Sequence, residues 1–136
     1  MTERPGHGRP RLELLNLGSG SGGNATLVIA GEGDRSRRIL VDCGFSMRRT
    51  ANALLELGIE LQQLDGIVLT HLDRDHFNPA WSRRIGQLGM PVHVASIHER
   101  EAVACGCPAD CLRVFEDEID FGADLTARTH LVTHDD

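Results

Sequence analysis

Three short apolar runs, separated by glycine-rich or polar turns, open the chain. They are 12–17 ("LELLNL"), 24–30 ("NATLVIA") and 37–44 ("RRILVDCG"). Apolar and β-branched runs of roughly four to eight residues bounded by turn residues are typical of strands. Short connections of this kind join neighbouring strands, so the opening third of the chain predicts an antiparallel β-meander.

Helix patterns alternate with apolar runs in the rest of the chain. Ser46 can cap a first helix, whose apolar residues recur at helical spacing until Gly58 ends it. Asn78 and Pro79 have the cap and first-turn chemistry of a second helix, which Gly89 ends. Further strands are expected at 65–70, 91–96, 112–117 and 124–133. The element order predicts a mixed α/β (α+β) chain.

Composition narrows the functional classes. At 136 residues the chain is long enough for one domain and too short for two comfortable ones. It has no apolar run long enough for a transmembrane helix and no signal-like apolar segment near the N-terminus, so a cytoplasmic protein without a membrane partner is expected. The net charge of −6 argues against broad adhesion to nucleic acid, and all 14 basic residues are Arg. Schiff-base and Walker-lysine chemistries are therefore excluded.

Three of the four cysteines lie in the segment "CGCPADC" (105–111). This spacing has no paired C-x2-C and no obvious fourth ligand, so a Gly/Pro loop with incidental thiols is favoured over a structural zinc site. The turn "GSGSGG" (18–23) fits the letters of a dinucleotide fingerprint. That fingerprint needs a helix after it, whereas a strand-like run follows here, so a tight hairpin with backbone amides near a site is favoured.

The segment "THLDRDH" (70–76) gathers ligand chemistry directly after the apolar run "DGIVL". It holds His71, Asp73, Asp75 and His76. Imidazole and carboxylate are ligands that zinc and similar metals accept, and the carboxyl end of a buried strand is where open α/β sheets place ligand sites. Turn chemistry would explain the aspartates but leave the histidines unexplained, so metal binding is favoured over a solvated loop.

The segment resembles the H-x-H-x-D-H signature of the metallo-β-lactamase fold, with Asp73 in place of the second histidine. "LNLGSGSGGNATLVIA", "ILVDCGFS" and "GIVLTH" follow in the order found in the branch with cytoplasmic phosphodiesterases and DNA exonucleases, and "THDD" (133–136) resembles the next motif. The resemblance implies the first half of an αββα sandwich, so residues 1–136 are expected to be one such domain truncated at its C-terminus.

The resemblance also implies roles for individual residues. His71, Asp73 and His134 would hold one metal ion, and Asp75 and His76 would contribute to a second. Asp75 would also orient the attacking water, and Asp42 would brace the metal loop by hydrogen bonds without ligating. Two divalent ions are implied, with zinc expected first and manganese or iron as alternatives. Asp73, as a harder ligand than imidazole, would favour manganese or iron(II) relative to zinc.

The remaining histidines have weaker claims. His93 alternates with valines and is expected on a strand surface. The segment "SIHE" (96–99) fits a capping box for a short helix ending near Ala104, which would leave His98 in the first turn without a role. His130 shares a strand face with His134, so either could reach a metal, and His134 is favoured.

The implied activity is hydrolysis by a metal-bound hydroxide, with a phosphodiester in a nucleotide or nucleic acid as the substrate. The paired arginines are either phosphate contacts or solvated helix faces; they are Arg48, Arg49, Arg83 and Arg84. Two alternatives stay open: a thioester or lactone hydrolase of the same fold, and a truncated or degenerate metal-binding module without turnover. Because the bridging aspartate and last histidine of the family lie beyond the motifs found here, the 136-residue chain alone is expected to be inactive.

Overall fold

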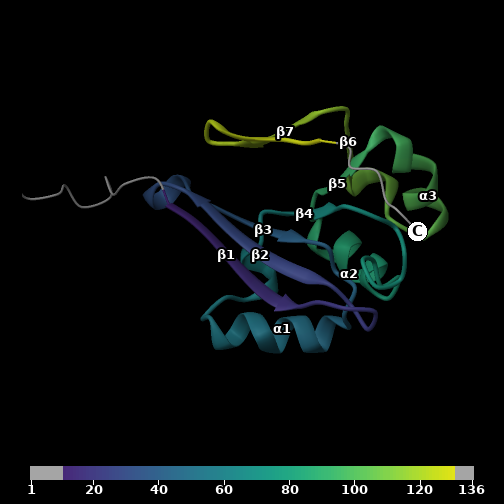
Figure 1. Ribbon diagram of the computed structural model, residues 1–136, viewed down its shortest axis with the longest axis horizontal. Coiled ribbons are helices and arrows are strands. Elements are labelled where there is room, and N and C mark those ends of the chain that lie inside the picture. Colours follow the sequence, from purple (N-terminus) through teal and green to yellow (C-terminus); the bar gives the residue numbers. More distant parts are fainter. Residues whose placement is uncertain (1–10, 131–136) are drawn as a thin grey trace, which may run out of the picture.

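The predicted meander is confirmed in the computed structural model, which describes residues 11–130. β1 (Arg11–Gly18), β2 (Ala25–Gly31) and β3 (Arg37–Val41) pair antiparallel in that order. The sheet then continues with parallel strands β4 (Gly66–Leu69), β5 (Val92–Ala95) and β6 (Leu112–Phe115). The six strands lie in sequence order across one sheet (Figure 1), so the mixed α/β prediction is confirmed.

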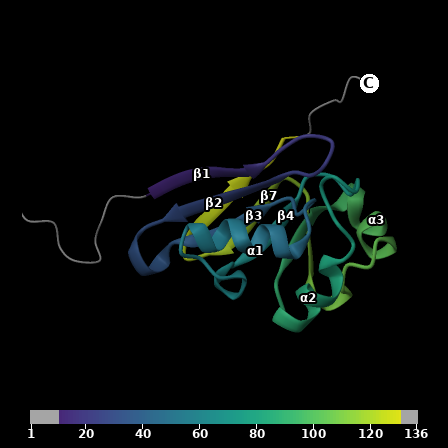
Figure 2. The ribbon, with the colours of Figure 1, turned by 90° about the horizontal axis from the view of Figure 1, so that it is seen from below.

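The helices connect the parallel strands and cover one face of the sheet (Figures 1 and 2). They are α1 (Met47–Glu56), α2 (Trp81–Leu88) and α3 (Glu99–Ala104). Short 3-10 turns lie at Gly33–Arg35, Leu61–Gln63, Ser96–His98 and Ala109–Cys111. Strand residues Leu27, Leu40 and Ile67 are fully buried against Leu54 of α1 and Trp81 of α2. Burying such side chains contributes roughly 1.5–3 kcal/mol each, which holds the helices on this face.

The helix signals had mixed outcomes. The Ser46 cap is confirmed, because its side chain accepts a hydrogen bond from the Arg49 amide at 3.2 Å. Gly89 ends α2 in the left-handed region with φ 61°, as expected. The predicted start of α2 is wrong: the helix begins at Trp81, because Asn78 accepts the Ala80 amide and forms a separate turn first.

The capping box at residues 96–99 is also wrong. The segment Ser96–His98 is a 3-10 turn, and His98 precedes the first residue of α3. The Ser96 hydroxyl donates to Glu116 Oε2 at 3.0 Å instead of capping the helix. Ser96 therefore bonds to a residue 20 positions away and not to the start of its own helix. A pattern of neighbouring residues cannot reveal a partner at that distance in the sequence.

The end of the described chain is a hairpin where one strand was predicted. β7 (Glu118–Gly122) and β8 (Leu125–Arg128) pair antiparallel and lie over the face of the sheet opposite α1 and α2 (Figures 1 and 2). β7 was missed because "EIDFG" is short and half acidic. Its two apolar side chains explain the strand, since Ile119 is buried and Phe121 meets His93 of β5 edge-on.

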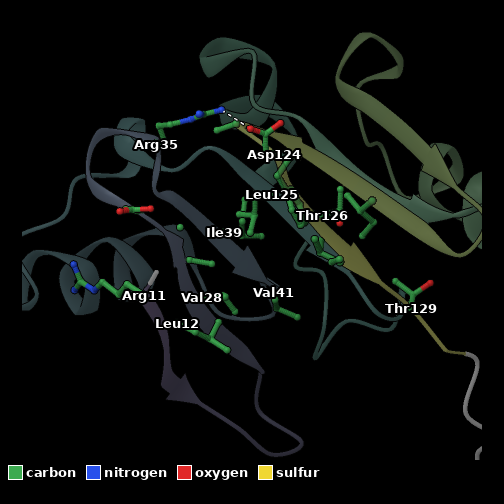
Figure 3. A pocket seen from close by; sticks show the side chains of 18 residues that line it. Arg11, Leu12, Val28, Arg35, Ile39, Val41, Asp124, Leu125, Thr126 and Thr129 are labelled. Carbon is green, nitrogen blue, oxygen red and sulfur yellow. Dashed lines mark hydrogen bonds and ion pairs between the residues drawn. The ribbon is translucent and has the colours of Figure 1, made fainter. Parts of the chain in front are cut away.

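An apolar cleft of about 690 Å³ lies between the hairpin and the sheet (Figure 3). Val28, Ile39 and Val41 line it from the sheet, and Leu125 lines it from the hairpin. An ion pair between Arg35 and Asp124, 2.9 Å from nitrogen to oxygen, spans one end. The apolar surface continues onto the edge strand β1, where Leu12 is 69% and Leu14 is 68% exposed.

We expect this surface to bind a hydrophobic dye such as ANS. Contiguous exposed apolar surface of this kind takes up apolar ligands or partners. Replacing Leu12 and Leu14 together by Gln should lower the dye fluorescence at least severalfold. Leu55→Gln, on the exposed face of α1, is the matched control and should leave it unchanged. A parent chain that binds no dye would contradict the expectation.

His93 lies in β5, as the sequence predicts, but the hairpin half-buries it where an open strand surface was expected. Its ring lies 5.3 Å from the Phe121 ring at an interplanar angle of 77°. Burial, and then the charge of Arg113 on the adjacent strand, lower the pKa of His93 below its ordinary value. Protonation of His93 therefore opposes the packing of the hairpin on the sheet.

Acid should weaken the fold through His93. Below about pH 6.5 His93 binds a proton in the unfolded chain but stays neutral in the folded chain. The free energy of unfolding therefore falls as the pH falls, and this loss ends once the pH is below the lowered pKa of His93 in the folded chain. Urea unfolding at pH 7 and pH 5 should show a smaller acid loss for His93→Gln than for the parent chain. An equal loss in both proteins would exclude His93 as the cause.

Candidate metal centre

The carboxyl ends of β3 and β4 build the core of the site. The two strands are parallel neighbours, with Val41 opposite Val68, so the segments that follow them leave the same edge of the sheet. The Asp42 amide still bonds to the Val68 carbonyl at 2.8 Å, but Asp42 itself has a φ of 66°. This left-handed conformation, which Asp tolerates better than most residues, turns the chain out of the strand.

The Asp42 carboxylate is buried, with 6% exposure, and accepts three hydrogen bonds. Its Oδ1 accepts the Thr70 amide at 2.8 Å, and its Oδ2 accepts the Thr70 hydroxyl at 2.7 Å. Oδ2 also lies 2.7 Å from His76 Nδ1. A neutral imidazole that donates through Nδ1 presents an unprotonated Nε2, so Asp42 aims the His76 lone pair away from itself.

The loop from Thr70 to Asn78 packs tightly against the end of β3. The Cys43 amide donates to the His76 carbonyl at 2.8 Å, and the Asn78 amide donates to the Cys43 carbonyl at 2.9 Å. Phe77 is buried and anchors the loop in the core. Gly44 allows this approach, because a Cβ there would lie 1.9 Å from the Asp75 carbonyl oxygen. A glycine two residues after Asp42 is thus a packing requirement of this loop.

Three of the predicted metal-ligand residues lie close together in this loop: His71, Asp75 and His76. The His71 and His76 rings have centroids 4.8 Å apart, and His76 Nε2 lies 3.6 Å from Asp75 Oδ2. Asp73 has an exposed side chain, and its carbonyl accepts the amides of His76 and Phe77. His134 lies outside the described residues.

Imidazole and carboxylate donors of this kind match the ligand chemistry of zinc and related divalent metals. Within residues 11–130, however, no three His, Cys, Asp or Glu side chains converge closely enough to hold an ion by themselves. The described donors therefore match a metal in kind only. Ligation by each of the predicted residues stays a prediction.

A cleft of about 500 Å³ adjoins the donors at the carboxyl ends of β4, β5 and β6. His71 and His98 line it with their ring centroids 6.3 Å apart, and Glu116 lines it as well. His130 also lines this cleft. Sequence reasoning gave His98 no role. The sequence did hold a signal for His98: it follows the strand β5, and residues that follow neighbouring parallel strands lie at the same edge of the sheet as His71.

The cysteine segment packs against α2, where the Cys111 thiol donates to the Ile85 carbonyl at 3.7 Å. Burial raises the pKa of Cys107 to about 11, with Cys111 and Cys105 adding to the shift. Burial also raises the pKa of Cys43 well above its ordinary value. Metals bind the thiolate form, which burial disfavours at Cys107, and this agrees with the loop interpretation of 105–111.

The paired arginines lie on α1 and α2. Arg49 stacks its guanidinium 4.0 Å from the centroid of the Phe45 ring, and Arg84 donates to Gln87 on its own helix at 3.4 Å. Arg48 and Arg83 are exposed. Phosphate contact by any of the four stays a prediction.

The family model of the metallo-beta-lactamase superfamily matches residues 18–80, which span the glycine-rich turn, Asp42 and the His71–His76 loop. Residues 18–80 of this chain are therefore similar to the metallo-β-lactamase superfamily. The anti-Pycsar protein Apyc1 of Bacillus phage 010DV004 is 38% identical over 74 residues, covering 50% of this chain and 26% of that protein. The chain thus spans about a quarter of the length of this curated relative.

Solved structures agree on the fold. The chemotaxis sensor ODP, in a peroxy diiron form, matches with a TM-score of 0.50 and 19% identity over 78% of this chain and 41% of that chain. The DIM-1 metallo-β-lactamase matches with a TM-score of 0.48 and 14% identity over 81% of this chain and 54% of that chain. The mixed α/β arrangement is therefore shared with part of the ODP structure, and the family-model match at residues 18–80 agrees with the predicted metallo-β-lactamase fold. No helix among residues 11–130 is long and apolar enough to cross a membrane.

We expect Asp42 to contribute more to the free energy of unfolding than the exposed Asp65 does. Asp42→Ala removes the buried acceptor of three hydrogen bonds and leaves part-buried donors on Thr70 and His76 unpaired, so we expect a loss of about 2–4 kcal/mol in the free energy of unfolding. Asp65→Ala, which removes one exposed bond to the Arg38 amide, should cost less than about 1 kcal/mol. Urea denaturation of both variants measures the difference, and equal losses would contradict this account.

Proposed function

We propose that the chain is the metal-binding part of a metal-dependent hydrolase that cleaves a phosphodiester. The observation that carries the proposal is the network in which buried Asp42 aims His76 Nε2 toward Asp75, beside His71 and an open cleft. A carboxylate that accepts the Nδ1–H of a histidine and leaves Nε2 free is the usual support of a metal-ligating histidine.

The residues have separate tasks in this reaction. His71, Asp73, His76 and His134 would hold divalent ions, with zinc, manganese or iron as candidates, and Asp75 would both ligate and accept a proton from the attacking water at its carboxylate. Asp42 keeps the His76 proton on Nδ1, which leaves Nε2 to ligate. Bound ions would acidify a water molecule and neutralise charge on the phosphoryl oxygens. The cleft along His98 and Glu116 would receive the group attached to phosphorus.

A phosphodiester is favoured over other substrates of this fold by two features. The glycine–serine turn before β2 resembles the phosphodiesterase and exonuclease branch, and the match to an anti-Pycsar protein favours a cyclic nucleotide among the diesters. A cytoplasmic location is part of this proposal. Since the chain spans a minority of the ODP structure and of the phage protein, full turnover would draw on further residues like those of the longer relatives.

The activity test compares substrates under one set of conditions. The chain, and its longer gene product wherever the reading frame continues past residue 136, is loaded with Zn²⁺ or Mn²⁺. Each is offered bis-p-nitrophenyl phosphate, a cyclic mononucleotide, a thioester and a lactone. We expect diester cleavage to exceed the other activities in the longer product and to be very weak in the 136-residue chain.

Asp75→Ala should lower the diester kcat/KM by at least about a hundredfold, because it removes a ligand and proton acceptor together. Asp65→Ala, remote from the donors, is the control and should retain activity. If the longer product prefers the thioester or the lactone, the proposed phosphodiester substrate is wrong. If the longer product binds metal but turns over none of the substrates, the protein is a metal-binding module and the proposed hydrolase activity is wrong.

A further inference from the structure

The side chain of Asn24 joins the glycine-rich turn to the candidate metal loop. Its Nδ2 donates to the Asp75 carbonyl at 3.0 Å and lies 3.3 Å from Asp75 Oδ2. The same nitrogen lies 3.0 Å from the Gly20 carbonyl, and Oδ1 accepts the Gly20 amide at 3.3 Å. One amide therefore bonds both the turn 18–23 and a residue 51 positions away.

The backbone holds Asn24 in this place from the other side. Its carbonyl accepts the Gly44 amide at 3.0 Å, and a Cβ on Gly44 would lie 2.9 Å from the Asn24 nitrogen and 1.9 Å from the Asp75 oxygen. The turn, the end of β3 and the metal loop are thus in direct contact. The Asn24 amide has little freedom to follow Asp75 if that residue moves, so it acts as a fixed reference point.

A hydrogen bond to one carboxylate oxygen restricts rotation of the whole carboxylate. With Oδ2 bonded to Asn24 Nδ2, rotation of the Asp75 carboxylate is restricted and the direction of Oδ1 is also set. We propose that Asn24 is a positioning residue that fixes the carboxylate of Asp75 for metal binding. This inference rests on the proposed function, and it gives the glycine–serine turn a task that neither nucleotide binding nor chain reversal provides.

The alternative is that Asn24 only closes its own turn. Asn16 shows what such a residue looks like, because its Oδ1 accepts the nearby Gly18 amide at 2.8 Å on the exposed side of the same turn. Asn24 makes comparable local bonds to Gly20 and, in addition, the bonds to Asp75. Asn16→Ala is therefore a matched control that disturbs the turn and spares Asp75.

The test is a titration of Co²⁺ into the metal-free chain, followed by calorimetry and by the visible absorption of the bound ion. Asn24→Ala should weaken binding by about ten- to a hundredfold, as is usual for residues that hold a metal ligand in place. Its absorption bands at saturating Co²⁺ should also shift, since the ligand geometry changes. Asn16→Ala should stay within twofold of the parent affinity, with unchanged bands.

A second variant guards against misfolding. Asn24→Ser keeps a hydroxyl that can bond within the turn but is too short to reach Asp75, so it should show the same affinity loss and band shift. Circular dichroism at the titration temperature verifies that each variant is folded. Parent-like affinity and spectrum in a folded Asn24 variant would overturn the positioning role and leave the proposed function standing. A parent chain that binds no Co²⁺ would overturn both.

Discussion

The buried carboxylate of Asp42 is the interaction on which the site depends. Taking a carboxylate out of water is costly unless hydrogen bonds replace its hydration, and Thr70 and His76 supply those bonds. The same bonds tie the end of β3 to the loop after β4. The Asp42 carboxylate therefore joins the ends of β3 and β4, holds the loop in place and sets which nitrogen of His76 faces the candidate metal.

Close backbone approach makes the site stiff. Gly44 lies against the Asp75 carbonyl, where any larger residue would force the loop away, and Asn24 bonds the same segment from the glycine-rich turn. Rigid support of this kind matters for a metal centre, because small shifts of a ligand lower affinity and misplace the reacting groups. The turn, the strand end and the loop should therefore respond to mutation as one unit.

The two faces of the sheet differ in how they are covered. The helices cover the face where the core lies, while the hairpin covers the other only in part and leaves an apolar cleft that runs out to Leu12. His93 lies beneath the hairpin, and its lowered pKa reflects that burial. The hairpin is therefore the element whose attachment should be most sensitive to acid, whereas the helix face should hold the core together.

The sequence alone determined the β-meander, the alternation of helices and parallel strands and the loop that carries His71 and His76, because these depend on local periodicity and turn chemistry. Tertiary structure decided the rest. β7 became a strand because Ile119 and Phe121 found partners across the sheet, and Ser96 left its predicted cap for Glu116. His98 and Asn24 acquired neighbours far away in the chain. Residue patterns report the preferences of a segment, but which distant groups it meets depends on the packing of the whole fold.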